Sequence, residues 1–145
     1  MLDLDARIAD NHARIESLVQ AAMPDLLDEP GVGPVNAAVL LVSWSHPGRF
    51  PTEAAFASNA GVSPLEASSG RHQRHRLNRS GDRRLNSALH SIAMTRARCH
   101  LPTRTYTERR RADGKNPREI RRCVKRYLAR HLYRLMETNA PQTRA

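Results

Sequence analysis

The sequence predicts an all-α fold, and two observations lead to that prediction. Apolar residues recur every three or four positions in segments 4–22, 82–98 and 117–137, which is the period of one helix face. No segment alternates apolar and polar residues as a half-buried strand does. A chain of 145 residues is long enough for one domain with an additional helix.

The first predicted element is a helix over residues 4–22 that resembles part of a coiled coil. Its seam positions are four and three residues apart, with one polar member: Leu4, Ile8, Asn11, Ile15, Leu18 and Ala22. Two interpretations stay open, because such a seam serves either homo-oligomerisation or packing on the chain's own domain. Pro24 ends the helix or kinks it, and we place an amino-terminal unit at residues 1–24.

The next segment resembles a helix-hairpin-helix. A short helix from Asp25 to Glu29 leads into a turn, and a second helix starts at Pro34 and runs through Val42. The turn glycines, Gly31 and Gly33, allow a phosphate to approach the backbone, and the first amides of the second helix point toward it. The alternative is a plain turn between two helices. Thr52 is expected to cap a further short helix.

Segment 65–82 is predicted to be a basic loop, because it has no apolar stripe and is rich in Ser, Gly, Asn, Arg and His. The following amphipathic helix, 82–98, has Ser80 or Asp82 as its cap and is expected to end before Pro102. After a polar hinge at 113–114, a second amphipathic helix covers 117–137. One face of this helix is expected to be buried: Ile120, Val124, Tyr127, Leu128, Leu132 and Leu135.

Charge is distributed unevenly along the chain. Residues 1–70 contain 3 Arg and 9 acidic residues, whereas residues 71–145 contain 21 basic and 5 acidic residues. A basic half of this kind is typical of proteins that bind nucleic acid. Six arginines within the loop and at the start of the next helix are the candidate phosphate contacts: Arg71, Arg74, Arg76, Arg79, Arg83 and Arg84. The alternative is a solvated charged face.

Other classes of protein and site are not indicated. The longest apolar run, 37–42, is far shorter than the roughly 20 residues of a membrane span, and no signal peptide opens the chain. Cys99 and Cys123 form no disulfide framework and are expected to be core residues of a cytoplasmic protein. Together with His100 and His131 they show no ligand spacing, so no metal site is predicted.

Ser68-Ser69-Gly70 directly precedes the arginine-rich run. A serine hydroxyl beside several guanidinium groups is placed to attack a phosphodiester while the arginines stabilise the developing charge. Taken alone, the tripeptide is more typical of a turn.

The order and spacing of several motifs resemble the C-terminal domain of insertion-sequence-110 (IS110/IS116/IS902-type) transposases. The resemblance spans residues 26–138 and rests on the turn at 30–33 with its following alanines, Arg49-Phe50-Pro51, segment 56–61, Pro64, Ser68-Ser69-Gly70 and segment 79–85. We therefore place a transposase C-terminal domain at 25–138 and a disordered tail at 139–145.

The resemblance implies DNA transposition guided by a structured RNA. It assigns the nucleophile to Ser69, the residue before the first glycine of the motif, and implies no cofactor in this chain. Magnesium belongs to the family's RuvC-like domain and its Asp-Glu-Asp-Asp carboxylates, which these residues do not include. Arg71 stands where many members have a second glycine. We therefore expect a partial enzyme; the alternatives are a non-catalytic nucleic-acid-binding module and a dimerising interaction protein.

Overall fold

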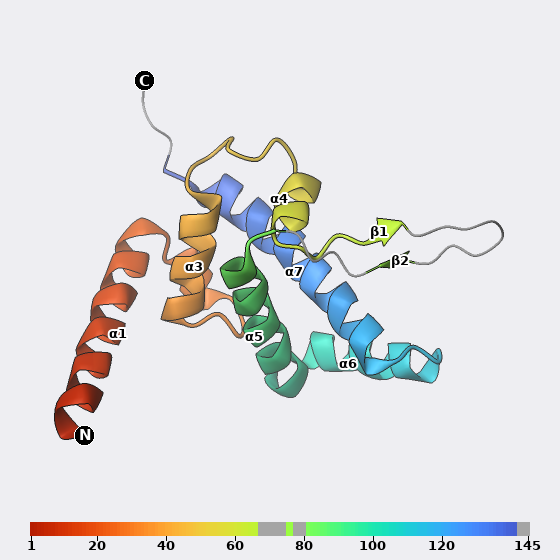
Figure 1. The fold of residues 1–145 in the computed structure, drawn as a ribbon, viewed down its shortest axis with the longest axis horizontal. Helices are drawn as coiled ribbons and strands as arrows, with labels where there is room; N and C mark the ends of the chain where they lie inside the picture. The colour runs from red at the N-terminus through yellow and green to blue at the C-terminus, as the bar shows by residue number, and fades with distance from the viewer. Residues whose placement is uncertain (67–74, 77–80, 142–145) are drawn as a thin grey trace.

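The computed structural model describes residues 1–66, 75–76 and 81–141, and the all-α prediction is confirmed for them. Seven helices and one pair of two-residue strands follow in chain order within these ranges. Their bounds are α1 (Leu2–Ala22), α2 (Asp25–Asp28), α3 (Pro34–Trp44), α4 (Glu53–Asn59), β1 (Leu65–Glu66), β2 (His75–Arg76), α5 (Arg83–Cys99), α6 (Leu101–Ala112) and α7 (Pro117–Asn139). Helix α1 and the strands lie at opposite ends of the longest axis (Figure 1).

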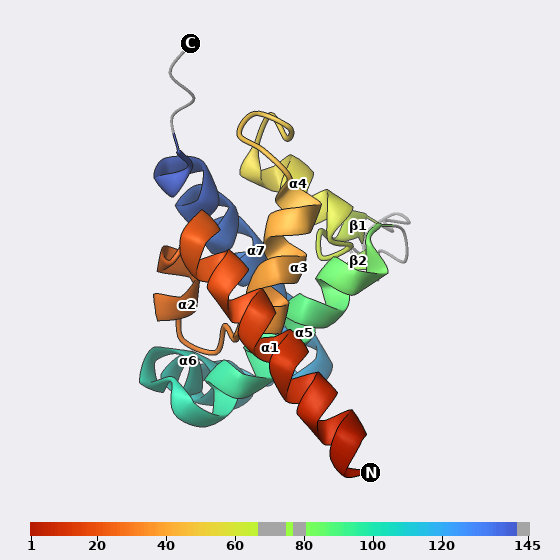
Figure 2. The ribbon, with the colours of Figure 1, turned by 90° about the vertical axis from the view of Figure 1, so that its left-hand side faces the viewer.

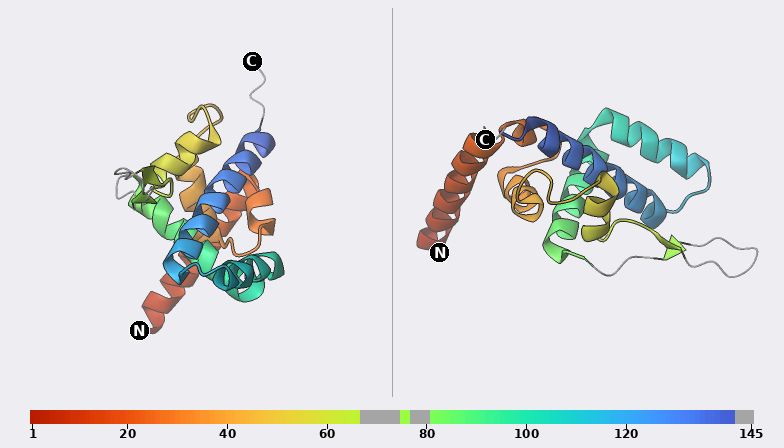
Figure 3. Two further views of the ribbon diagram at one scale, coloured as in Figure 1. Left: turned by 90° about the vertical axis from the view of Figure 1, so that its right-hand side faces the viewer. Right: turned by 90° about the horizontal axis from the view of Figure 1, so that it is seen from above.

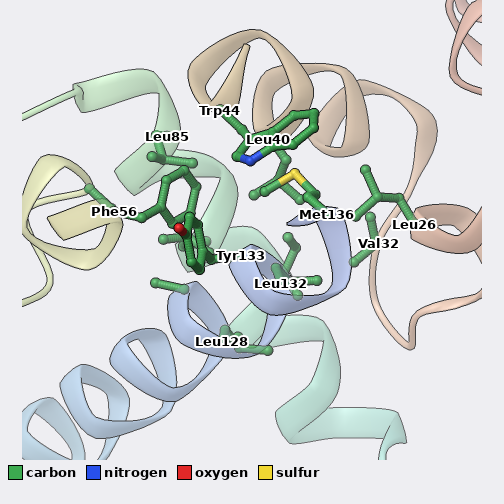
Figure 4. Close-up of a cluster of buried hydrophobic side chains, with 14 of the residues drawn as sticks. Leu26, Val32, Leu40, Trp44, Phe56, Leu85, Leu128, Leu132, Tyr133 and Met136 are labelled. Carbon is green, nitrogen blue, oxygen red and sulfur yellow. The ribbon is translucent and has the colours of Figure 1, made fainter. Parts of the chain in front are cut away.

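Helix α7 forms the centre of the core. It packs against α2, α3, α4, α5 and α6, and seven of its residues are buried: Ile120, Val124, Leu128, Ala129, Leu132, Tyr133 and Met136. Side chains from α3, α4 and α5 meet it, among them Leu40, Phe56 and Leu85 (Figure 4). The rings of Phe56 and Tyr133 lie 5.6 Å apart, centroid to centroid. This apolar cluster fixes the positions of α4 and α5. These helices flank the segment predicted to be a basic loop, residues 65–82, which is called the basic segment below.

The buried face of α7 is wider than its sequence pattern predicts. Ala129 and Tyr133 are buried against the neighbouring helices, whereas Tyr127 is 57% exposed, so its assignment to the core was wrong. Tyr127 lies at the edge of the apolar face and stacks on the His131 ring with a 7° interplanar angle. Cys99 is likewise exposed, because α5 extends past the core there.

Helix α6 was not predicted. It begins at Leu101 directly after α5, and His100 serves as the cap residue of both helices. Pro102 lies in the first turn of α6, where a missing N–H breaks no intrahelical bond, and so it opens a helix there. None of the α6 residues is buried, which explains why no apolar stripe indicated the helix.

Only the last turns of α1 belong to the core. Val19 is 2% exposed and Met23, directly after the helix, is 1% exposed, whereas Leu4 and Ile8 are 58% exposed. Helix α1 packs on α3, and its first half extends beyond the rest of the molecule (Figure 2). The predicted helix is confirmed, but the seam residues of its first half make no core contact within the described chain.

The described helices include none with the length and apolar character needed to cross a bilayer.

Candidate nucleic-acid interface

The basic segment leaves the body of the protein as an antiparallel pair of strands. Leu65 pairs with Arg76 and Glu66 with His75, so the segment predicted to be a basic loop contains one pair of two-residue strands within the all-α fold. Of the predicted site residues, Arg76 lies in β2, whereas Ser69, Arg71, Arg74 and Arg79 lie outside the described residues. The right-hand view of Figure 3 shows that the strands extend away from the helices.

Both ends of the segment between α4 and α5 are held at the C-terminal end of α4. The Asp82 N–H donates a hydrogen bond of 2.7 Å to the Asn59 carbonyl oxygen. Gly81 has a φ of +113°, and a Cβ added there would meet that same carbonyl oxygen and the backbone nitrogen of Gly61. Only glycine fits both the backbone conformation and the space. This region, Asn59 to Gly61 with Gly81 and Asp82, is called the hairpin root below.

Asp82 connects the hairpin root to α5 and α3. Its Oδ1 accepts hydrogen bonds from the backbone N–H groups of Arg84 and Leu85, at 2.9 and 3.1 Å, and its Oδ2 accepts one from the Ser43 hydroxyl at 2.9 Å. Asp82 is therefore the helix cap, one of the two predicted candidates. Burial alone would raise the pKa of this carboxyl, but the hydrogen bonds from Leu85, Ser43 and Arg84, with the Arg84 charge, hold the pKa below its ordinary value.

Arg83 and Arg84 form the first turn of α5 and are both exposed. Because Asp82 fixes the start of this helix, the two guanidinium groups extend from a defined position beside the hairpin root. Of the six arginines predicted to contact phosphate, these two have described side chains.

The two glycines of the predicted helix-hairpin-helix lie in different surroundings. Gly31, at a φ of +80°, faces α5, where an added Cβ would stand 3.1 Å from the Ile92 carbonyl oxygen and 3.2 Å from the Arg96 Cγ. Gly33 caps α3, and a Cβ there would meet nothing within 4 Å. Gly31 therefore permits close packing of the turn on α5, and only Gly33 faces open space.

Arg96 ties that turn to α5. Its Nε donates to the Pro30 carbonyl oxygen and its Nη2 to Glu29 Oε2, both at 2.7 Å. His131 of α7 lies 3.0 Å from the same Glu29 oxygen. The turn thus packs near the C-terminal end of α5, while the hairpin root is at the N-terminal end. At 1.5 Å per residue, the two predicted contact regions are separated by about 20 Å along α5, so the fold does not bring them together.

The sequence did not show which basic residues of α7 form ion pairs with carboxylates and which do not. Arg130 and Arg134 lie 3.5 and 2.9 Å from the Glu53 carboxylate. Lys125 instead donates a 2.7 Å hydrogen bond to the neutral Asn86 side chain. All three side chains belong to the same charged stripe in the sequence, and only the positions of α4 and α5 distinguish them.

The described residues contain no group of three His, Cys, Asp or Glu side chains close enough to hold a metal ion.

Comparison with known proteins agrees with the sequence resemblance. The family model of the transposase IS116/IS110/IS902 family matches residues 24–108. A Streptomyces coelicolor protein named "Insertion element IS110 uncharacterized 43.6 kDa protein" is 41% identical over 107 residues, which cover 71% of this chain and 26% of that relative. The chain thus spans about a quarter of the length of this curated relative. The chain belongs to the IS116/IS110/IS902 family of transposases.

Proposed function

We propose that the chain binds DNA and supplies the serine nucleophile for strand exchange by an insertion-element transposase. The observation that supports this most is the hairpin root, where Gly81 and Asp82 fix both ends of the segment that contains Ser69. Family membership supports the transposase role, and the basic half of the sequence supports a polyanionic partner.

In the proposed reaction, the Ser69 hydroxyl oxygen attacks a backbone phosphorus of DNA. A bond forms between Ser69 Oγ and phosphorus, and the bond from phosphorus to one deoxyribose oxygen breaks. The hydroxyl proton passes to a base, and the leaving oxygen takes up a proton. Arg83 and Arg84, with the arginines of the basic segment, contact the flanking phosphates and stabilise negative charge.

The remaining parts of the proposal follow from the family resemblance. Magnesium-binding carboxylates act from a separate RuvC-like domain, and a structured guide RNA is a second nucleic-acid partner. The proposal includes a cytoplasmic location, where a DNA substrate of this kind is accessible.

Strand cleavage of a DNA duplex tests the proposal, with the RuvC-like domain of a related transposase and its guide RNA supplied in trans. We expect no cleavage by the chain with magnesium alone and cleavage in the complete mixture. Ser69→Ala abolishes it, and Ser68→Ala, the neighbouring serine, preserves it. Cleavage by Ser69→Ala at the level of Ser68→Ala would show that the nucleophile is another residue.

A second candidate function is self-association through α1. Leu4 and Ile8 are 58% exposed and Leu18 is 71% exposed, on a helix that otherwise has the spacing of a coiled-coil seam. Sedimentation of the wild type and of Asn11→Leu tests it. A wild-type dimer that becomes more stable and less uniform in subunit number with Asn11→Leu supports a paired seam. If the wild type and the variant are both monomeric at high protein concentration, self-association through α1 is excluded.

A further inference from the structure

The α5–α7 cluster, defined as Asn86, His90, Arg121 and Lys125, is a second group of polar side chains at the hairpin root. Lys125 Nζ donates to Asn86 Oδ1 at 2.7 Å, and Asn86 Nδ2 donates to the Ala60 carbonyl oxygen at 2.9 Å. Ala60 is the C-terminal cap residue of α4. An unbroken chain of hydrogen bonds therefore joins the lysine of α7 to the point where the basic segment leaves the body.

Three members of the cluster are positively charged or can become so. His90 is one helical turn beyond Asn86 on α5, and Arg121 is one turn before Lys125 on α7, while α5 and α7 pack together. Burial, Lys125 and Arg121 lower the pKa of His90, and burial and Arg121 lower the pKa of Lys125. The positive charges of His90, Arg121 and Lys125 therefore repel one another.

Carboxylates pair with some basic residues of α5 and α7, and within the described part of the chain none pairs with the cluster. Within the described ranges, the ion pairs join Arg96 and His131 to Glu29, Arg130 and Arg134 to Glu53, and Arg110 to Asp113. None of these described pairs involves Arg121 or Lys125. All four side chains of the cluster are partly exposed, so an anion from solvent can reach them.

We propose that the α5–α7 cluster binds one phosphodiester group of a nucleic-acid backbone. Lys125 supplies a compact charge already oriented by Asn86, and Arg121 supplies a planar donor suited to two phosphate oxygens. This inference rests on the proposed function and adds a backbone contact on the rigid body of the protein, beside the hairpin root. The bound phosphate supplies the negative charge that carboxylates supply to the paired residues, and it offsets the repulsion between the positive groups of the cluster.

Two variants with the same change in charge test the proposal. Lys125→Gln removes a charge whose hydrogen bond goes to the neutral Asn86, and Arg134→Gln removes one already paired with Glu53. We measure affinity for a DNA duplex and for an RNA hairpin over a range of salt concentrations. On DNA, Lys125→Gln lowers the magnitude of the log–log salt slope by about 0.9, the value of one phosphate contact, and Arg134→Gln lowers it less.

The His90 ring provides a second readout that needs no nucleic acid. Inorganic phosphate raises the His90 pKa in an NMR titration of the wild type, because an anion favours the imidazolium. The phosphate dependence disappears in Lys125→Gln, and the resonance of the exposed His12 on α1 is the internal control. A melting temperature of Lys125→Gln at or above that of the wild type shows that the variant folds.

The outcomes separate the cluster from the proposed function. A phosphate response at His90 that requires Lys125 shows that the cluster binds phosphate. If the chain then binds neither DNA nor RNA, the proposed function fails, and so does the assignment of that phosphate to a nucleic-acid backbone. Equal salt slopes for the two variants on both nucleic acids, with His90 unmoved by phosphate, would overturn the cluster and leave DNA binding intact. A reduced slope on only one nucleic acid identifies the source of the phosphate.

Discussion

The N–H of Asp82 donates a 2.7 Å hydrogen bond to the carbonyl oxygen of Asn59 and so closes the chain on itself at the base of the basic segment. The segment begins and ends at one place on the folded body, and α5 starts there with its helix cap already satisfied.

Gly81→Ala is expected to disrupt the hairpin root. A Cβ at Gly81 would overlap the Asn59 carbonyl oxygen, and the φ of +113° strains any other residue. We expect the strain alone to lower the free energy of unfolding by about 1–3 kcal/mol, with the steric overlap adding to it. Gly114→Ala is the matched control, because its φ is +84° and its added Cβ meets nothing within 4 Å. Equal losses in urea unfolding of the two variants would contradict a packing role for Gly81.

The Asp82 carboxyl makes stability depend on acid pH. Its pKa in the folded protein lies below the ordinary value of 3.8, so it stabilises the fold at pH values above the unfolded pKa. That contribution is lost as the pH falls through the folded pKa. Asp82→Asn keeps an N-cap side chain but cannot ionise. Urea unfolding is measured at neutral pH and below pH 3.8, and the free energy of unfolding should fall less between the two for Asp82→Asn than for the wild type. Equal decreases in the two proteins would show that Asp82 is not responsible.

Removing one partner of the Glu29–Arg96 ion pair is expected to lower the stability of the fold strongly. Arg96 has a side chain only 5% exposed, and Glu29 is 17% exposed. Arg96→Gln should lower the free energy of unfolding by about 3 kcal/mol, because the largely buried Glu29 charge then keeps only the His131 ring as a described partner. Arg134→Gln, at a side chain 55% exposed, should change it by less than about 1 kcal/mol. Similar values for both would show that burial does not strengthen the first pair.

The sequence predicted the helices that have an apolar period or clear turn and cap residues. It missed the features that depend on where distant elements pack. The period of Ile120, Val124 and Leu128 indicated α7, because a buried face must recur every turn. Helix α6 buries no residue, so its sequence has no such signal, and Pro102 was interpreted as a stop although it occupies a first turn.

The candidate site shows the same limit. Asp82 was predicted as a cap from its type and position, since capping is local chemistry. Gly31 was predicted to face a phosphate, yet its packing on Ile92 and Arg96 depends on where α5 lies. Lys125 and Arg134 have equal charge in the sequence, and only the fold places Asn86 beside one and Glu53 beside the other.

Arginine contacts with the backbone should make DNA binding strongly dependent on salt. If six phosphates are neutralised, the slope of log affinity against log salt is about −5. Replacing Arg74, Arg76 and Arg79 together with alanine should reduce its magnitude by at most about 3. Filter binding over a series of salt concentrations measures the slope. Affinity that does not change with salt, or no binding to DNA or RNA, would contradict the role of the basic segment.

The most direct test of the account is to identify the residue that becomes covalently joined to DNA. In the mixture that contains a RuvC-like domain and guide RNA, the protein is trapped on a cleaved duplex, digested with protease and analysed by mass spectrometry. The account predicts a phosphodeoxyribonucleotide on Ser69, absent when the chain is incubated with DNA and magnesium alone. A nucleotide on Ser68, on Tyr106 or on any other residue would contradict it, as would an adduct formed without the added domain.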